Sequence, residues 1–150
     1  MGGTFAARVL LTVLGAASMV VGAFLRWASF EGSEGVDAPI GVFWTPNVQG
    51  DANLVASAGA VFILLGVLAV VGLALRTGVL TRVAGALAIV GFVLVVITIY
   101  RIEGANLGIG DVREGLWLIL AGGILALIGG FLGTRTVVTR TATAPPPPAA

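Results

Sequence analysis

Four long runs of apolar residues without a charged side chain dominate the chain. They cover residues 9–25, 54–75, 83–100 and 116–133. Each run approaches the roughly 20 residues that a helix needs to cross about 30 Å of hydrocarbon at about 1.5 Å per residue. A backbone in lipid must satisfy its own hydrogen bonds, and the runs lack the alternation of barrel strands. The pattern therefore predicts an all-α membrane protein in which four transmembrane helices form a bundle.

The charged residues between these runs predict the orientation. The N-terminal segment, the turn between the second and third runs and the C-terminal tail together hold five Arg and no acid, whereas segments 26–53 and 101–114 hold three Arg and seven acids. Basic residues close to span ends stay preferentially in the cytoplasm. We therefore expect a multi-pass protein of a bacterial plasma membrane, with both termini in the cytoplasm and two outer loops.

Composition narrows the classes of function. Hydrophobic residues make up 58% of the chain and charged residues 10%, and the chain has neither Cys nor His. Disulfides, thiolate ligands, the commonest metal ligand and the usual general base are thereby excluded. The four runs contain no ionisable side chain of the kind that marks proton relays and ion sites. We expect no enzyme, no catalytic residue, no cofactor or metal site, and no nucleic-acid partner.

The fourth run carries a regular pattern of glycine. The pairs Gly122-Gly123 and Gly129-Gly130 are seven residues apart, and Gly133 follows. Seven residues are close to two helical turns, so each set lines one face. Small residues let helices approach closely in lipid. These glycines are predicted to pack helices within the bundle or to dock a partner helix, and the fourth run has more Gly than one neighbour needs.

The first outer segment, residues 26–53, concentrates aromatic side chains. It has a net charge of −3 and contains Trp27, Phe30, Phe43 and Trp44. An aromatic loop of this length is predicted to fold over the bundle and to offer a docking surface outside the membrane. The alternative is a solvated connector whose aromatic residues anchor the helix ends at the membrane interface.

The C-terminal segment differs from the rest of the chain. Residues 134–150 are rich in Thr and Pro and are predicted to form a disordered cytoplasmic tail after a transmembrane domain of residues 1–133.

The apolar runs show signs of an internal repeat. Residues 58–66 and 121–129 are alike, and the first and third runs both begin at the Val of an Arg-Val pair. The sequence therefore leaves open a duplicated helical hairpin with a pseudo-two-fold axis along the membrane normal.

Two segments carry a resemblance to a known group. The end of the first run, residues 22–27 (GAFLRW), and the start of the fourth, residues 115–123 (GLWLILAGG), resemble the small four-helix membrane proteins of high-GC actinobacteria. In that group the residues at the end of the first transmembrane helix often read Leu-Pro-Trp, whereas Arg26 takes the place of the Pro here. The resemblance covers most of the chain up to Gly133 and implies a Gram-positive-type envelope and no activity.

Two functions agree with these features. The first is a non-catalytic accessory or scaffold subunit of a larger membrane complex, which docks partner subunits through the Gly-rich helix faces and the aromatic outer loop. The alternative is a homo-oligomeric channel or facilitator for a small or lipidic solute, because uncoupled conduction needs no buried charge. Membrane lipids surround the chain in both cases.

Overall fold

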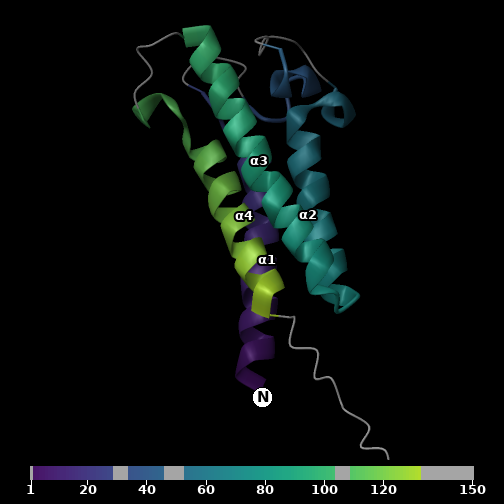
Figure 1. Ribbon diagram of the computed structural model, residues 1–150. Coiled ribbons are helices and arrows are strands. Elements are labelled where there is room, and N and C mark those ends of the chain that lie inside the picture. Colours follow the sequence, from purple (N-terminus) through teal and green to yellow (C-terminus); the bar gives the residue numbers. More distant parts are fainter. Residues whose placement is uncertain (1, 29–33, 46–52, 104–108, 133–150) are drawn as a thin grey trace, which may run out of the picture.

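The computed structural model describes residues 2–28, 34–45, 53–103 and 109–132. In these ranges the chain forms four α-helices and short 3₁₀ turns, in the order α1 (Gly2–Phe24), η1 (Ile40–Phe43), η2 (Leu54–Ala56), α2 (Ala58–Ala74), α3 (Gly78–Glu103), η4 (Ile109–Asp111) and α4 (Glu114–Leu132). The helices run side by side in an elongated bundle, with the N-terminus at one end and η1 and η2 at the other (Figure 1). The prediction of an all-helical fold is confirmed for the described residues, whereas four membrane-spanning helices and the orientation of the termini stay predictions.

The four helices form a ring. Helix α4 packs extensively against both α1 and α3, and α2 packs against the same two helices from the opposite side. Helices α1 and α3 thus lie on one diagonal of the ring and α2 and α4 on the other. A two-fold axis between two hairpins would require this arrangement, but any ring of four helices in chain order has it too. The duplicated hairpin therefore stays a prediction.

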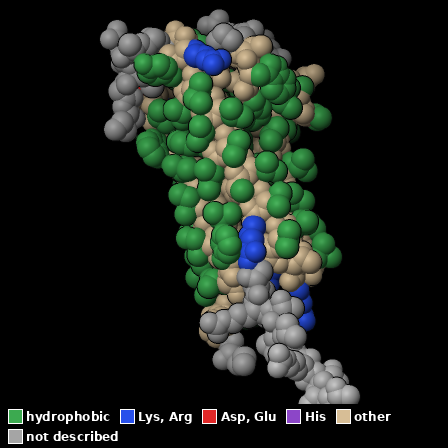
Figure 2. All heavy atoms as spheres, in the orientation of Figure 1, with side chains coloured by type: hydrophobic (Ala, Val, Ile, Leu, Met, Phe, Trp, Pro, Cys, Tyr) green, Lys and Arg blue, Asp and Glu red, His purple; other side chains and the backbone are tan. Residues whose placement is uncertain are grey.

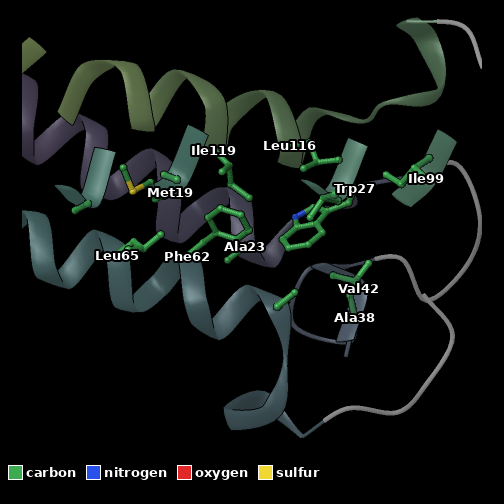
Figure 3. Close-up of a cluster of buried hydrophobic side chains, with 14 of the residues drawn as sticks. Met19, Ala23, Trp27, Ala38, Val42, Phe62, Leu65, Ile99, Leu116 and Ile119 are labelled. Carbon is green, nitrogen blue, oxygen red and sulfur yellow. The ribbon is translucent and has the colours of Figure 1, made fainter. Parts of the chain in front are cut away.

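The interior is filled by a few large side chains set among many small ones. Met19, Phe62, Leu116 and Ile119 are fully buried, and they lie along one continuous cluster between the helices (Figure 3). Most of the other buried apolar positions on the helices are Ala. Helices in lipid associate through close packing rather than through exclusion of water, so small contact residues stabilise the bundle by letting the backbones approach.

The outward faces of all four helices carry large apolar side chains. Val13, Leu64, Leu87 and Ile124 are examples that are exposed by 42% or more. Figure 2 shows hydrophobic side chains along the whole visible face of the bundle. An apolar surface of this extent exceeds what soluble monomers expose. Helices α1, α3 and α4 are long and apolar enough to cross a membrane, and α2 is an apolar helix of 17 residues.

Helix α2 begins later than the apolar run suggests. The run starts at Leu54, but residues Leu54–Ala56 form the turn η2, and the α-helix begins at Ala58. Ser57 separates the two because its hydroxyl oxygen accepts a hydrogen bond from the Ala60 amide at 3.1 Å, as an N-cap does. At about 1.5 Å per residue, the helix is about 26 Å long, which is slightly less than the hydrocarbon thickness.

A tight turn joins α2 to α3. Arg76 adopts the left-handed conformation, with φ of 56°, and its amide donates to the Leu73 carbonyl at 3.1 Å. Glycine is the usual residue at such a helix end, because a Cβ is disfavoured in this conformation. An Arg here places a positive charge at the C-terminal, negative end of the α2 dipole.

Candidate functional site

Two of the predicted packing glycines face α1. A Cβ atom built on Gly122 would lie 2.6 Å from the Gly15 carbonyl oxygen, and one on Gly129 would lie 2.7 Å from the Thr12 hydroxyl. Both distances are shorter than real side chains tolerate. Gly15 makes the reciprocal contact, because its own Cβ would lie 2.7 Å from the Gly122 carbonyl oxygen. The α1–α4 interface is therefore a backbone-to-backbone contact that depends on glycine in both helices.

The other two described glycines of the pattern face α3. A Cβ on Gly123 would lie 3.1 Å from the Gly85 carbonyl oxygen, and one on Gly130 would lie 2.7 Å from the Arg82 Cγ. Gly133 lies outside the described residues. The apparent surplus of glycine in α4 is explained by its two close neighbours, one on each side. Both glycine faces of α4 are covered by the chain's own helices.

Trp27 is the centre of the outer-loop aromatic cluster. It is 2% exposed, its indole N–H donates to the Gly22 carbonyl at 2.9 Å, and its ring meets Phe62 edge-on at 5.5 Å between centroids. The ring of Phe43 also packs against Phe62, with 6.1 Å between the ring centroids. A Cβ on Gly35 would overlap the Trp27 ring. Trp27 thus points into the bundle beside Phe62 (Figure 3), and Phe43 packs against the same Phe62 ring.

The described part of the loop is also tied to the helices by hydrogen bonds. The Thr98 hydroxyl of α3 donates to the Val42 carbonyl at 2.7 Å, in a buried position. The Gly59 amide at the start of α2 donates to the Gly35 carbonyl at 2.6 Å. Residues 34–45 therefore form a cap on one end of the bundle, and the predicted folding-over of the loop is seen in these residues.

Trp44 differs from the other loop aromatics. It follows η1 directly and is 65% exposed, and Ile40 beside it is 41% exposed. Phe30 lies outside the described residues. Among the described loop aromatics chosen from the sequence, Trp44 is the one whose ring is open to a partner.

A carboxylate pair lies in the same cap. The pKa of Glu34 is raised above its ordinary value of 4.5, first by the hydrogen bond from its side chain to Asp37, then by burial and by the charge of Asp37, while Arg26 opposes the shift. Within the described ranges, no group of three or more His, Cys, Asp or Glu side chains could hold a metal ion. The effect of the pair is that Glu34 keeps its proton to a higher pH than an isolated Glu, which lowers the negative charge of the cap.

The opposite end of the bundle holds a polar cluster that the sequence pattern did not single out. Arg8 is only 7% exposed, and its Nε and Nη2 atoms are shielded from solvent without a hydrogen-bond partner. Thr12, one turn further along α1, is fully buried, and its hydroxyl also lacks a partner. A buried donor left unsatisfied costs roughly 1–3 kcal/mol, and more when the group is charged.

Arg82 lies on the other side of the same turn of α4. Its guanidinium carbon is 4.3 Å from the centroid of the Phe131 ring, which is the geometry of a cation–π interaction. Arg8 and Arg82 thus flank the last described turn of α4, at the negative end of the helix dipole. Both arginines immediately precede apolar runs. If the first run is extended by one helical turn toward the N-terminus, Arg8 lies on the same helix face as Thr12 and Gly15, because these residues are four and seven positions further along the helix.

A groove runs along the outer surface between α1 and α2. It encloses about 490 Å³ and is lined by apolar residues alone. Its floor consists of Ala16, Ala17 and Gly66, and valines form its two walls. The shape arises because small residues stand between branched ones on both helices. The groove is large enough for one or two bulky side chains of another helix.

Comparisons with protein-family models, with curated proteins and with solved structures find no match for the chain. Function must therefore be argued from the geometry itself.

Proposed function

We propose that the chain is a non-catalytic accessory or scaffold subunit of a larger membrane protein complex. In this proposal it crosses a bacterial plasma membrane four times, with both termini in the cytoplasm and the cap outside. The short helix α2 is the second span, since 17 residues fall within the range of about 17–25 seen for transmembrane helices.

The apolar groove between α1 and α2 is the observation that carries the proposal. Small residues on its floor, Ala16, Ala17 and Gly66, allow another backbone to come close, and transmembrane helices associate through such surfaces. The described glycines of α4 are occupied within the chain, whereas this groove is a small-residue surface on the outside of the described helices that a partner helix can reach. Trp44 offers a second contact outside the membrane.

The alternative, a homo-oligomeric channel, has less support. A water-filled pore between copies needs polar side chains on an outward face. Four hydroxyl side chains of the helices and their caps are buried instead: Thr12, Ser57, Thr81 and Thr98. The Thr81 hydroxyl donates a hydrogen bond to the Ala69 carbonyl at 3.2 Å. A lipidic solute would not need a polar lining. Flux measurements should therefore test a facilitator for a lipidic solute.

The test is gentle affinity purification from native membranes, with mass spectrometry of the bound proteins. We expect a stoichiometric partner with the unchanged chain. Ala17→Leu fills the groove and should release the partner, whereas Ala86→Leu places the same side chain on an exposed position of α3, away from the groove, and should retain it. A chain that purifies alone from several mild detergents contradicts the proposal. Loss of the partner with both variants contradicts the assignment to the groove.

A further inference from the structure

The guanidinium of Arg8 has buried nitrogen atoms without a hydrogen-bond partner in the described part of the molecule. The Arg8 residue as a whole is 7% exposed, and its Nε and Nη2 atoms are shielded from solvent without an acceptor. A guanidinium presents its N–H donors in a planar fork that matches the oxygen atoms of a carboxylate or a phosphate. An anion with several acceptor oxygens is the ligand that this side chain lacks.

The chain itself has no acidic side chain to offer at this end. Residues 1–30, 54–102 and 115–150 contain neither Asp nor Glu. No Asp or Glu side chain of the described residues is therefore placed to pair with Arg8, and we look for the anion in another molecule. Arg8 and Arg82 both stand directly before a long apolar run, at residues 9 and 83 respectively. Side chains at such positions lie near the boundary between the hydrocarbon and the lipid headgroups, where phosphate groups are abundant.

We propose that Arg8 binds the phosphate of an anionic phospholipid and that Arg82, on the other side of the last turn of α4, adds positive charge that attracts the same lipid surface. The lipid belongs to the leaflet that meets the N-terminal end of α1 and the last turn of α4. Arg8 reaches the phosphate by rotating its long side chain toward the interface, and this relieves its unsatisfied buried donors. Arg82 is held on the other side of α4 by its contact with Phe131. The site does not depend on the proposed partner subunit.

The experiment uses the full chain in an uncharged detergent. Its melting temperature is followed by tryptophan fluorescence during titration with phosphatidylglycerol, with phosphatidylcholine or with sodium phosphate. We expect phosphatidylglycerol to raise the melting temperature at concentrations at which the other two have little effect. Arg8→Gln should raise the lipid concentration needed for the same shift by about tenfold, because it removes charge-assisted hydrogen bonds.

The matched control is Arg76→Gln, which removes the same charge at the same end of the bundle from an exposed turn. It should respond like the unchanged chain. Equal responses to phosphatidylglycerol and phosphatidylcholine overturn the proposal, and so does an equal loss in Arg8→Gln and Arg76→Gln. If sodium phosphate alone reproduces the shift, the ligand is free phosphate and the lipid assignment is overturned. Should Arg8→Gln fail to fold, Arg82→Gln must show the same selective loss.

Discussion

The contact between α1 and α4 allows a quantitative test of how the bundle is held together. In Gly122→Ala, the new Cβ would lie 2.6 Å from the Gly15 carbonyl oxygen and 3.0 Å from both the Cγ and the amide nitrogen of Met19, whereas ordinary contacts begin at 3.4 Å. The Gly15 carbonyl belongs to the α1 backbone and cannot rotate away. One methyl group therefore forces the two helices apart by up to about 0.8 Å.

This displacement sets the expected magnitude. A gap of about 0.5–1 Å forfeits a quarter to a half of the dispersion energy of each atom pair that it opens. Insertion of a methylene into a packed interior typically costs about 1–3 kcal/mol, and the better helix propensity of Ala returns up to about 1 kcal/mol. We expect Gly122→Ala to lower the free energy of unfolding by about 1–2 kcal/mol.

The assay is reversible unfolding of the full chain in mixed micelles by titration with sodium dodecyl sulfate, followed by tryptophan fluorescence. Gly3→Ala is the control, because a Cβ on Gly3 meets nothing within 4 Å, so its unfolding midpoint should stay equal or rise slightly. If Gly122→Ala and Gly3→Ala unfold at the same midpoint, the close contact of α1 with α4 does not hold the bundle together. Gly122 would then be free to serve a partner, as the sequence pattern also allowed.

Three further changes test the cap and the α2–α3 turn. Thr98→Val removes the hydrogen bond to the Val42 carbonyl at 2.7 Å, which should cost about 1–3 kcal/mol and speed amide exchange at Val42; unchanged exchange would contradict this anchoring role. Because the pKa of Glu34 is raised by Asp37, the folded state holds that proton more tightly than the unfolded state, so stability should fall as the pH rises from the ordinary value of 4.5 upward. Glu34→Gln should remove this part of the pH dependence, and a profile identical to that of the unchanged chain would refute it. Arg76→Gly should raise the free energy of unfolding by up to about 1 kcal/mol, because glycine adopts φ of 56° without strain; a fall in thermal stability would refute this.

The apolar pattern predicted the helices well but not what their faces contact. The helices cover most of each apolar run, because a run without charge that long can satisfy its backbone in lipid only as a helix. The start of α2 at Ala58 could have been read from Ser57, a residue type favoured at N-caps. The seven-residue glycine spacing identified contact faces on α4, yet a spacing cannot say whether the neighbour is α1, α3 or another protein.

Trp27 and Arg8 show why the rest needed a structure. The burial of Trp27 depends on Gly35, eight residues later, returning over its ring, and no local pattern encodes that return. The first apolar run starts at residue 9, directly after Arg8, so the run itself does not include the arginine. The helix α1 continues through Arg8, and this residue is 7% exposed with its Nε and Nη2 atoms shielded from solvent.

The interfaces of α4 and of α2 with their neighbours differ in how closely the helices approach. Helix α4 is held on both sides by glycine contacts with α1 and α3, whereas α2 packs less extensively against those same helices. A Cβ on Gly66 would lie 3.1 Å from the Ala16 carbonyl oxygen, a looser contact than that of Gly122 with Gly15. Beside this looser contact the groove opens to the surface. Since close packing is a main source of helix association in lipid, a partner helix seated in the groove would add packing contacts to α2. Binding of the proposed partner should therefore protect the amides of α2 from exchange more than those of α4.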